Sequence, residues 1–316
     1  MYRLGRAVIL SSAALGLAAL YLLYNMNPDN IGYLLPRRLP VLGAIVLGAW
    51  AAGVSALSFQ TVANNHIITP GIMGLEGLFV LAHTVLIMTA PGFRTSDPLP
   101  AFGFALSVLL LYSLVLIRQL RRAESGVEIL LLTGIVASTL FTSANAFLQK
   151  VMDPNEFSLL QSSTLGSIGN VNPRVLAAGA ALAIVCTVML YAVRNRLDVL
   201  ALGKDTAVSL GVRYRRTVRI VILICLSLTG ISTAVIGPFP YLGLVIASVT
   251  RAWFRDHRHA RLFPAAFMTG FIVILGGHLV VERLLKNRLT LPVFLNLAGG
   301  IVFLILVTRR SNSASS

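Results

Sequence analysis

Long apolar runs alternate with short polar stretches along almost the whole chain. A membrane-spanning helix needs about 20 consecutive, mostly apolar residues. Nine runs reach or approach that length: Ala7–Tyr24, Val41–Phe59, Ile72–Thr89, Phe102–Ile117, Val127–Leu148, Val175–Val193, Val218–Ile236, Phe263–Val281 and Leu291–Val307. Because a helix satisfies its own backbone hydrogen bonds in lipid, this pattern predicts an all-α protein that crosses a bilayer many times.

A tenth segment, Gly237–Val249, is apolar but short, and Pro238 and Pro240 stand near its start. It is either a broken span or a surface loop. A discontinuous helix is tolerated at membrane depth only where protein or a water-filled cavity covers its free backbone groups. If the segment crosses, its break is therefore expected inside the bundle.

Composition agrees with a bilayer environment. Of the 316 residues, 56% are hydrophobic and 12% are charged, whereas about a quarter of a soluble domain is charged. The net charge of +15 would suggest nucleic acid in a soluble protein. Here the Lys and Arg residues lie between apolar runs, which is typical of membrane topology. We therefore expect membrane lipid around the chain and no nucleic-acid partner.

The basic residues favour one span count, because cytoplasmic loops of membrane proteins collect Lys and Arg. With ten spans and both termini inside, 18 of the 26 basic residues lie on the cytoplasmic side. If Gly237–Val249 did not cross, the basic group Arg251–Arg261 would move outside and the bias would shrink. The sequence thus predicts about ten transmembrane helices in a bacterial cytoplasmic (inner) membrane, one of them short and broken near Pro238 and Pro240.

Motifs for catalysis and for metal or cofactor binding are missing from the sequence. It contains no GxxxxGK[ST] phosphate loop, no HExxH and no paired carboxylates, and Cys186 and Cys225 stand alone in apolar runs. We expect no enzyme activity, cofactor or metal, and energy from a partner. An ion-coupled secondary transporter is the alternative, and it would need Glu76, Glu128 or Glu282 as a coupling-ion site.

A polar stripe marks the fifth run. Ser138, Thr142, Asn145 and Gln149 recur at spacings of four, three and four, so they share one helix face. Such a stripe either forms hydrogen bonds between helices or lines a translocation path.

A long basic loop, Arg194–Arg219, separates the sixth and seventh runs. Within it, the spacing of Asp205, Ala207 and Leu210 before Gly211 predicts a short amphipathic helix with a glycine stop. The loop either is simply solvated or carries a docking helix for a cytoplasmic partner.

Five ordered blocks resemble one family. FQTVANNHIITPGIMG, beginning at Phe59, is similar to the segment after the second span in permeases of the ABC importers for iron siderophores, haem and vitamin B12. The other similar blocks are Ala201–Val212, Gly237–Arg251, Asp256–Arg258 and Asn296–Gly300. The wording of the first block is closest to the branch that serves catecholate-type ferric siderophores. The chain departs from the family pattern where Lys204 replaces an acidic residue.

The resemblance implies a permease subunit whose single transmembrane domain spans residues 1–316, with a cytoplasmic coupling loop at 194–216. It implies a second, homologous but different permease chain, two ABC ATPase subunits and a periplasmic or lipid-anchored siderophore-binding protein. The cargo would be a ferric siderophore of the catecholate type, with haem or another iron chelate as the alternative. The polar stripe would then face the path shared by the two permeases.

The resemblance also implies two contact surfaces. The residues expected to couple to an ATPase are Lys204, Asp205, Ala207, Leu210, Gly211, Arg251 and Arg255. On the outer side, Arg37, Arg38 and Arg283 resemble arginines that pair with glutamates of the binding protein. Contact between these arginines and lipid phosphates is the alternative explanation.

Overall fold

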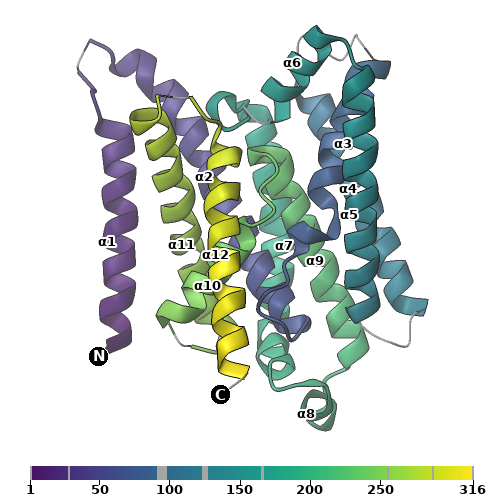
Figure 1. The fold of residues 1–316 in the computed structure, drawn as a ribbon. Helices are drawn as coiled ribbons and strands as arrows, with labels where there is room; N and C mark the ends of the chain where they lie inside the picture. The colour runs from purple at the N-terminus through teal and green to yellow at the C-terminus, as the bar shows by residue number, and fades with distance from the viewer. Residues whose placement is uncertain are drawn as a thin grey trace.

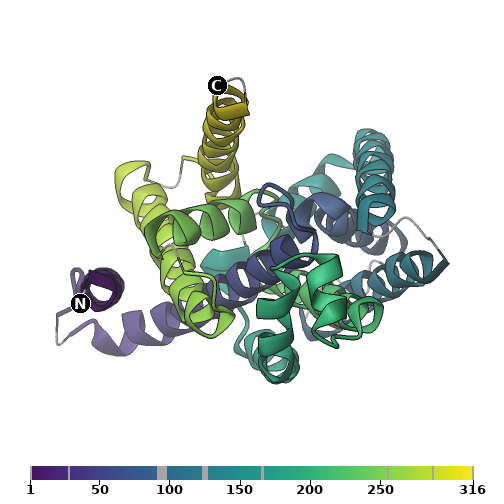
Figure 2. The same cartoon turned by 90° about the horizontal axis from the view of Figure 1, so that it is seen from below.

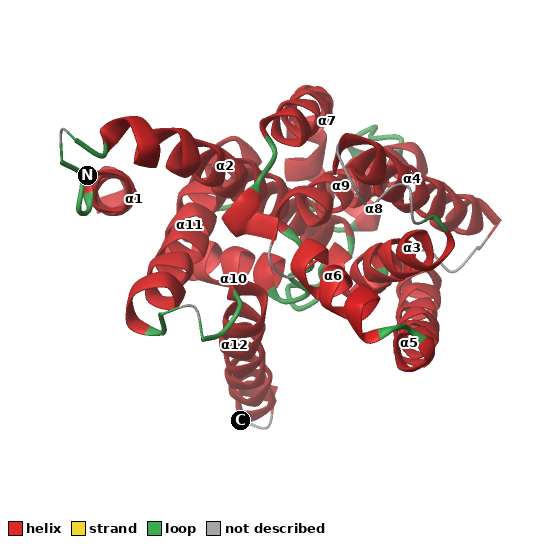
Figure 3. Cartoon of the chain, turned by 90° about the horizontal axis from the view of Figure 1, so that it is seen from above, coloured by secondary structure: helices red, strands yellow, loops and turns green. Residues whose placement is uncertain are grey.

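A computed structural model describes residues 2–27, 29–90, 98–122, 127–164, 167–254, 256–286 and 288–314. In this described part every regular element is helical (Figure 3). The α-helices are α1 (Tyr2–Leu23), α2 (Ile31–Val62), α3 (Leu75–Thr89), α4 (Pro98–Arg122), α5 (Val127–Val151), α6 (Pro154–Thr164), α7 (Pro173–Leu200), α8 (Lys204–Ser209), α9 (Tyr214–Ile236), α10 (Leu242–Phe254), α11 (His259–Leu279) and α12 (Leu291–Ala314). The short helices are η1 (Pro70–Met73), η3 (Ser167–Asn170) and a π-helical turn, η4 (Val280–Leu284), that continues α11.

Seven of these helices are long and apolar enough to cross a membrane: α1, α2, α4, α5, α7, α9 and α11 with η4. Three shorter apolar helices, α3, α10 and α12, account for the remaining predicted segments. The all-α, multi-pass class is confirmed, and each of the ten apolar segments contains a helix. The count of ten crossings stays a prediction that depends on the three shorter helices.

The bundle has a buried centre and an exposed edge. Both chain ends and α8 lie at one end of the bundle, and α6 lies at the other (Figure 1). Seen from below, α1 and α12 stand apart at the periphery while α2 runs through the middle (Figure 2). In the most apolar stretch of each helix, 78% of α2 and 72% of α9 is buried, compared with 11% of α1 and 17% of α5.

Small residues let the central helices approach closely. A Cβ atom added at Gly53 of α2 would lie 3.1 Å from the carbonyl oxygen of Ala266 in α11. A Cβ atom at Gly270 of α11 would likewise lie 3.1 Å from the carbonyl oxygen of Ala49. Lipid-embedded helices associate through such close backbone packing, because lipid provides no hydrophobic drive between them.

Two breaks in the helices lie inside the bundle. Gly74, with φ +87°, separates η1 from α3, and Gly237, with φ +98°, ends α9 five residues before α10 begins. Both φ values are in the region that L residues with a side chain rarely adopt. Residues 237–239 are buried, so the predicted break at Pro238 and Pro240 is confirmed and is covered by protein.

Candidate transport path and its two ends

A cavity of about 500 Å³ lies where the residues around η1 meet α5 and α10. Two residues of the predicted stripe, Ser138 and Thr142, are in its wall. The other lining residues are Ile67, Ile68, Thr69, Ile72, Ile135, Thr139, Ser143, Tyr241 and Leu244. Hydroxyl groups on an apolar wall give a small polar molecule weak and replaceable contacts, which suits passage better than tight binding.

The structure divides the predicted stripe into two parts. Ser138 and Thr142 line the cavity, and the Thr142 hydroxyl donates to the Ser138 carbonyl at 2.8 Å. Asn145 instead accepts a hydrogen bond from the Thr84 hydroxyl of α3 through its Oδ1, at 2.7 Å. Gln149 is half-buried and is not in the wall of this cavity. Asn145 therefore forms a hydrogen bond between helices, whereas the role of Ser138 and Thr142 in a translocation path stays a prediction.

Close backbone packing fixes this wall. A Cβ atom at Gly74 would lie 3.0 Å from the backbone nitrogen of Ser138, and one at Gly134 would lie 2.9 Å from the Cβ atom of Met73. The break between η1 and α3 thus packs directly on the backbone of α5. Thr139 and Ser143 also line the cavity and were missed; their spacing of four was the available signal.

At the α8 end, the predicted short helix is confirmed. It runs from Lys204 to Ser209, and Gly211, with φ +79°, follows its C-cap Leu210. Lys204, Asp205, Leu210 and Gly211 are exposed.

One coupling residue needs correction: the Ala207 side chain is 0% exposed, because it packs inward under α8. It therefore has no free surface for a partner in this conformation. Leu202 and Val208, which are 61% and 55% exposed, were missed. Together with Leu210 they form what we call the α8 apolar patch.

Arg251 lies on α10 but is bound to the end of α2. Its Nε donates to Gln60 Oε1, and its Nη2 donates to Thr61 Oγ1 and to the Leu57 carbonyl, all at 3.3 Å. This half-buried guanidinium holds two helices together, so it is not part of the α8 apolar patch. Arg255 lies outside the described residues.

Comparison with known proteins shows to which family the chain belongs. The model of the FecCD transport family matches residues 7–309. The chain belongs to this family. The petrobactin import system permease protein YclO of Bacillus subtilis (strain 168) is 34% identical over 311 residues, covering 98% of each chain. The petrobactin import system permease protein FatC of Bacillus anthracis is 31% identical over 313 residues, covering 96% of this chain and 88% of the relative.

Solved structures agree on the fold of this FecCD-family chain. An inward-facing metal-chelate type ABC transporter superposes with a TM-score of 0.79 at 20% identity, covering 97% of this chain and 98% of that chain. PsaBC from Streptococcus pneumoniae in complex with Fab gives a TM-score of 0.59 at 14% identity, covering 88% and 92%. At these identities the likeness concerns the fold alone.

Two of the three predicted docking arginines, Arg38 and Arg283, lie at the C-terminal end of α1 in this FecCD-family chain. The Arg283 guanidinium lies 4.1 Å from the ring centre of Tyr24, and its Nη2 lies 3.1 Å from Glu282 Oε1. The exposed Arg37 stacks on Tyr33, also at 4.1 Å.

Arg38 differs from the other two arginines. It is 9% exposed, and its Nη1 donates to the carbonyls of Leu22 and Tyr24 at 2.8 and 2.9 Å. Basic side chains at a helix C-terminus satisfy its free carbonyls in this way. The expectation of an exposed docking arginine is corrected for Arg38, which caps α1.

A polar network near α8 was not found from the sequence. His259 Nδ1 lies 2.6 Å from Asp198 Oδ1, and His259 Nε2 lies 2.9 Å from Thr61 Oγ1. The network joins the ends of α7, α11 and α2, and Arg251 also contacts Thr61. It had no sequence signal, because its members are far apart along the chain.

Proposed function

We propose that this chain is the permease subunit of an ABC importer that carries a petrobactin-like, catecholate-type ferric siderophore across the bacterial cytoplasmic membrane. The similarity to the two petrobactin import permeases, 34% and 31% over nearly the full chain, carries the proposal. The chain works as a single transmembrane domain without an ATPase site of its own. Two partner ATPases supply the energy.

The path runs along the hydroxyl-lined face of α5. Ser138 and Thr142 present polar atoms at the surface of a helix that is only 17% buried in its most apolar stretch. In lipid such groups are costly unless protein or water covers them. A second, homologous permease chain facing α5 closes the cavity and keeps it wet. Asn145 and Gln149 border the path, and Asn145 also ties α5 to α3.

The coupling surface is the α8 apolar patch with Lys204, Asp205 and Gly211 beside it. Exposed Leu202, Val208 and Leu210 bury apolar area when they enter a groove of an ATPase. The buried Ala207 packs α8 against the bundle. Arg251 ties α10 to the end of α2 through its hydrogen bonds. The Asp198–His259–Thr61 network then transmits an ATPase movement to α2 and α11 as a rigid-body shift.

The opposite end receives a periplasmic or lipid-anchored binding protein. Arg37 and Arg283 offer charged groups to its acidic residues, while Arg38 holds the end of α1 in place. Both termini lie with α8 on the cytoplasmic side. The shared position of α8 and the chain ends in Figure 1 and the concentration of Arg and Lys there support this orientation.

Uptake of radiolabelled ferric petrobactin into iron-starved cells tests the proposal. Cells lacking this chain should lose uptake, and the wild-type gene should restore it. A Val208→Asp, Leu210→Asp double variant should reach the membrane but fail to restore uptake, because charge opposes burial in an apolar groove. Ser209→Asp, on an exposed neighbour in the same helix, is the matched control and should restore uptake.

Three results would count against the proposal. Undiminished uptake without the chain would remove the petrobactin assignment, and competition with haem or other iron chelates would then identify the cargo. Full uptake by the double variant would remove the coupling role of the patch. Uptake that survives ATP depletion but stops when the membrane potential collapses would favour an ion-coupled transporter instead.

A further inference from the structure

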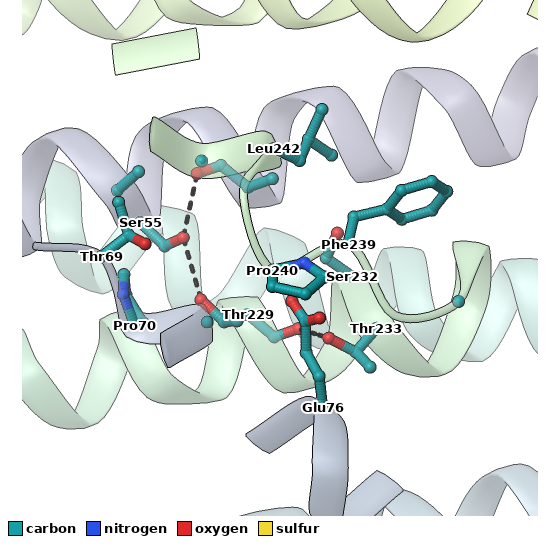
Figure 4. A pocket seen from close by; sticks show the side chains of 15 residues that line it. Ser55, Thr69, Pro70, Glu76, Thr229, Ser232, Thr233, Phe239, Pro240 and Leu242 are labelled. Carbon is teal, nitrogen blue, oxygen red and sulfur yellow. Dashed lines mark hydrogen bonds between the residues drawn. The ribbon is translucent and has the colours of Figure 1, made fainter. Parts of the chain in front are cut away.

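A second and much smaller cavity lies where the two helix breaks meet. It has room for about 20 Å³, the space of one water-sized particle. Its wall combines η1, the start of α3, the break between α9 and α10, and the C-terminal halves of α2 and α9 (Figure 4). The lining residues are Ala52, Ser55, Ala56, Thr69, Pro70, Gly71, Glu76, Thr229, Ser232, Thr233, Gly237, Phe239, Pro240, Leu242 and Gly243.

Glu76 is the charged residue of this cavity. Its side chain is 7% exposed, and its Oε2 atom is buried without a hydrogen-bond partner. In Figure 4 the carboxylate points from α3 toward Pro240 and the hydroxyls of α9. Among the described residues that line the cavity there is no Lys, Arg or His. A buried carboxylate without a compensating charge is strongly unfavourable, so something must neutralise it.

The surrounding backbone places partial positive charge beside the Glu76 carboxylate. The carboxylate is in the first turn of α3, where the helix dipole favours negative charge. The backbone N–H of Phe239 also faces it. The Glu76 Oε1 atom is held close to the chain, since a Cβ atom at Gly71 would lie 3.0 Å from it. These groups hold the charge in place but do not cancel it.

The hydroxyl protons of Ser55, Thr229 and Thr233 are directed to other acceptors than Glu76. Ser55 donates to the Ala52 carbonyl at 3.1 Å, so Thr229 must supply the proton in the 3.0 Å contact between the Thr229 and Ser55 hydroxyls. Thr233 donates to the Thr229 carbonyl at 2.9 Å. The oxygens of Thr229 and Thr233 thus offer lone pairs to the cavity. Oxygen acceptors without donors, around one carboxylate, match the chemistry of a cation rather than that of an anion.

We propose that the Glu76 cavity binds one small monovalent cation of about the size of Na⁺, held by the Glu76 carboxylate and the hydroxyl oxygens of Thr229 and Thr233. A single carboxylate balances a single positive charge, whereas a divalent ion would leave net charge in an apolar core. Broken helices inside other membrane transporters hold Na⁺ with comparable oxygen atoms. The small cavity also excludes a hydrated ion.

The bound cation fastens the two breaks to each other. Glu76 belongs to the η1–α3 side, and Thr229 and Thr233 belong to α9, just before the second break. Thr69 lines both this cavity and the 500 Å³ cavity. Occupancy therefore stabilises the wall of the transport path, without any requirement that the ion itself be transported.

Thermal unfolding of the purified full chain in detergent tests the site. NaCl is exchanged for N-methyl-D-glucamine chloride at constant ionic strength and fixed pH. The wild type should show a saturable rise in melting temperature with Na⁺, because a ligand that binds only the folded state stabilises it. Glu76→Gln should lose this dependence. Glu128→Gln, at an exposed carboxylate of α5, is the matched control and should keep it.

Thr229→Val and Thr233→Val keep the carboxylate and serve as the test if Glu76→Gln does not fold. Each should raise the half-saturating Na⁺ concentration roughly tenfold, as expected for loss of one oxygen ligand of a charged group. A melting temperature that responds to pH but not to Na⁺, Li⁺ or K⁺ would show that a proton neutralises Glu76 and would overturn the proposal. An unchanged Na⁺ response in all three variants would overturn it too. None of these outcomes depends on uptake, so the cargo assignment is tested separately.

Discussion

Helices α2 and α5 have nearly the same mean hydropathy, 1.9 and 1.7, but opposite surroundings. In its most apolar stretch α2 is 78% buried, whereas α5 is 17% buried and stands at the edge of the bundle (Figure 3). The polar residue Ser55 of α2 is bonded within the core, while Thr142 of α5 opens into the 500 Å³ cavity. Hydropathy shows that a helix must avoid water, but it does not show whether the helix lies in the protein core or faces lipid.

Residue size does distinguish these two helices. Gly53 of α2 faces the α11 backbone at a distance that leaves no room for a side chain. The outward face of α5 carries large apolar side chains, among them Leu132, Leu140 and Phe147, which are 64–67% exposed. Small residues therefore mark the centre, and large exposed ones mark the surface left for lipid or a partner chain.

The largest effect on stability is expected from Gly53→Leu. The new side chain would meet the Ala266 carbonyl and Ile246, so it should destabilise the bundle by at least about 1–3 kcal/mol and reduce the folded yield in the membrane. Gly103→Leu on α4 is the matched control, since nothing lies within 4 Å of a Cβ atom there. Fluorescence-detected size-exclusion chromatography after heating measures both. Equal losses would contradict the comparison of centre and edge.

A smaller loss of stability is expected from Asn145→Ala. It removes the 2.7 Å hydrogen bond to Thr84, and interhelical bonds in membranes average about 0.6 kcal/mol, with higher values up to about 1.7. The melting temperature of the purified chain should fall modestly. If Thr84→Ala and the double variant give the same loss as Asn145→Ala alone, the effect belongs to this bond. If the losses of the two single variants add up in the double variant, the effect of Asn145→Ala does not come from the bond to Thr84.

The smallest effect on stability is expected from Thr142→Leu. The side chain is exposed on α5, so the free energy of unfolding should stay within about 0.5 kcal/mol of the wild-type value. Uptake of ferric petrobactin should nevertheless fall, because an apolar group replaces a hydroxyl in the proposed path. Thr133→Leu, at a half-buried α5 position that does not line the cavity, should leave uptake intact. Normal uptake in Thr142→Leu would remove this residue from the path.

Much of the site was readable from residue spacing. The four-residue spacing of Ser138 and Thr142 placed both on one face, and the structure puts both in one cavity wall. Gly211 correctly marked the end of α8. Spacing did not show which member of the stripe bonds to α3, and the resemblance did not show that Ala207 faces the bundle, because a six-residue helix turns one side inward.

The sequence by itself determined the all-α class, the apolar segments, the break at Pro238 and Pro240, and the family resemblance. These features depend on local composition and on residues close together in the chain. Only the tertiary structure revealed that Arg38 caps α1, that His259 joins Asp198 to Thr61, and that Glu76 Oε2 is buried without a hydrogen-bond partner. Such contacts join residues from different helices. Their identity depends on how the helices pack, which hydropathy and spacing along one helix do not encode.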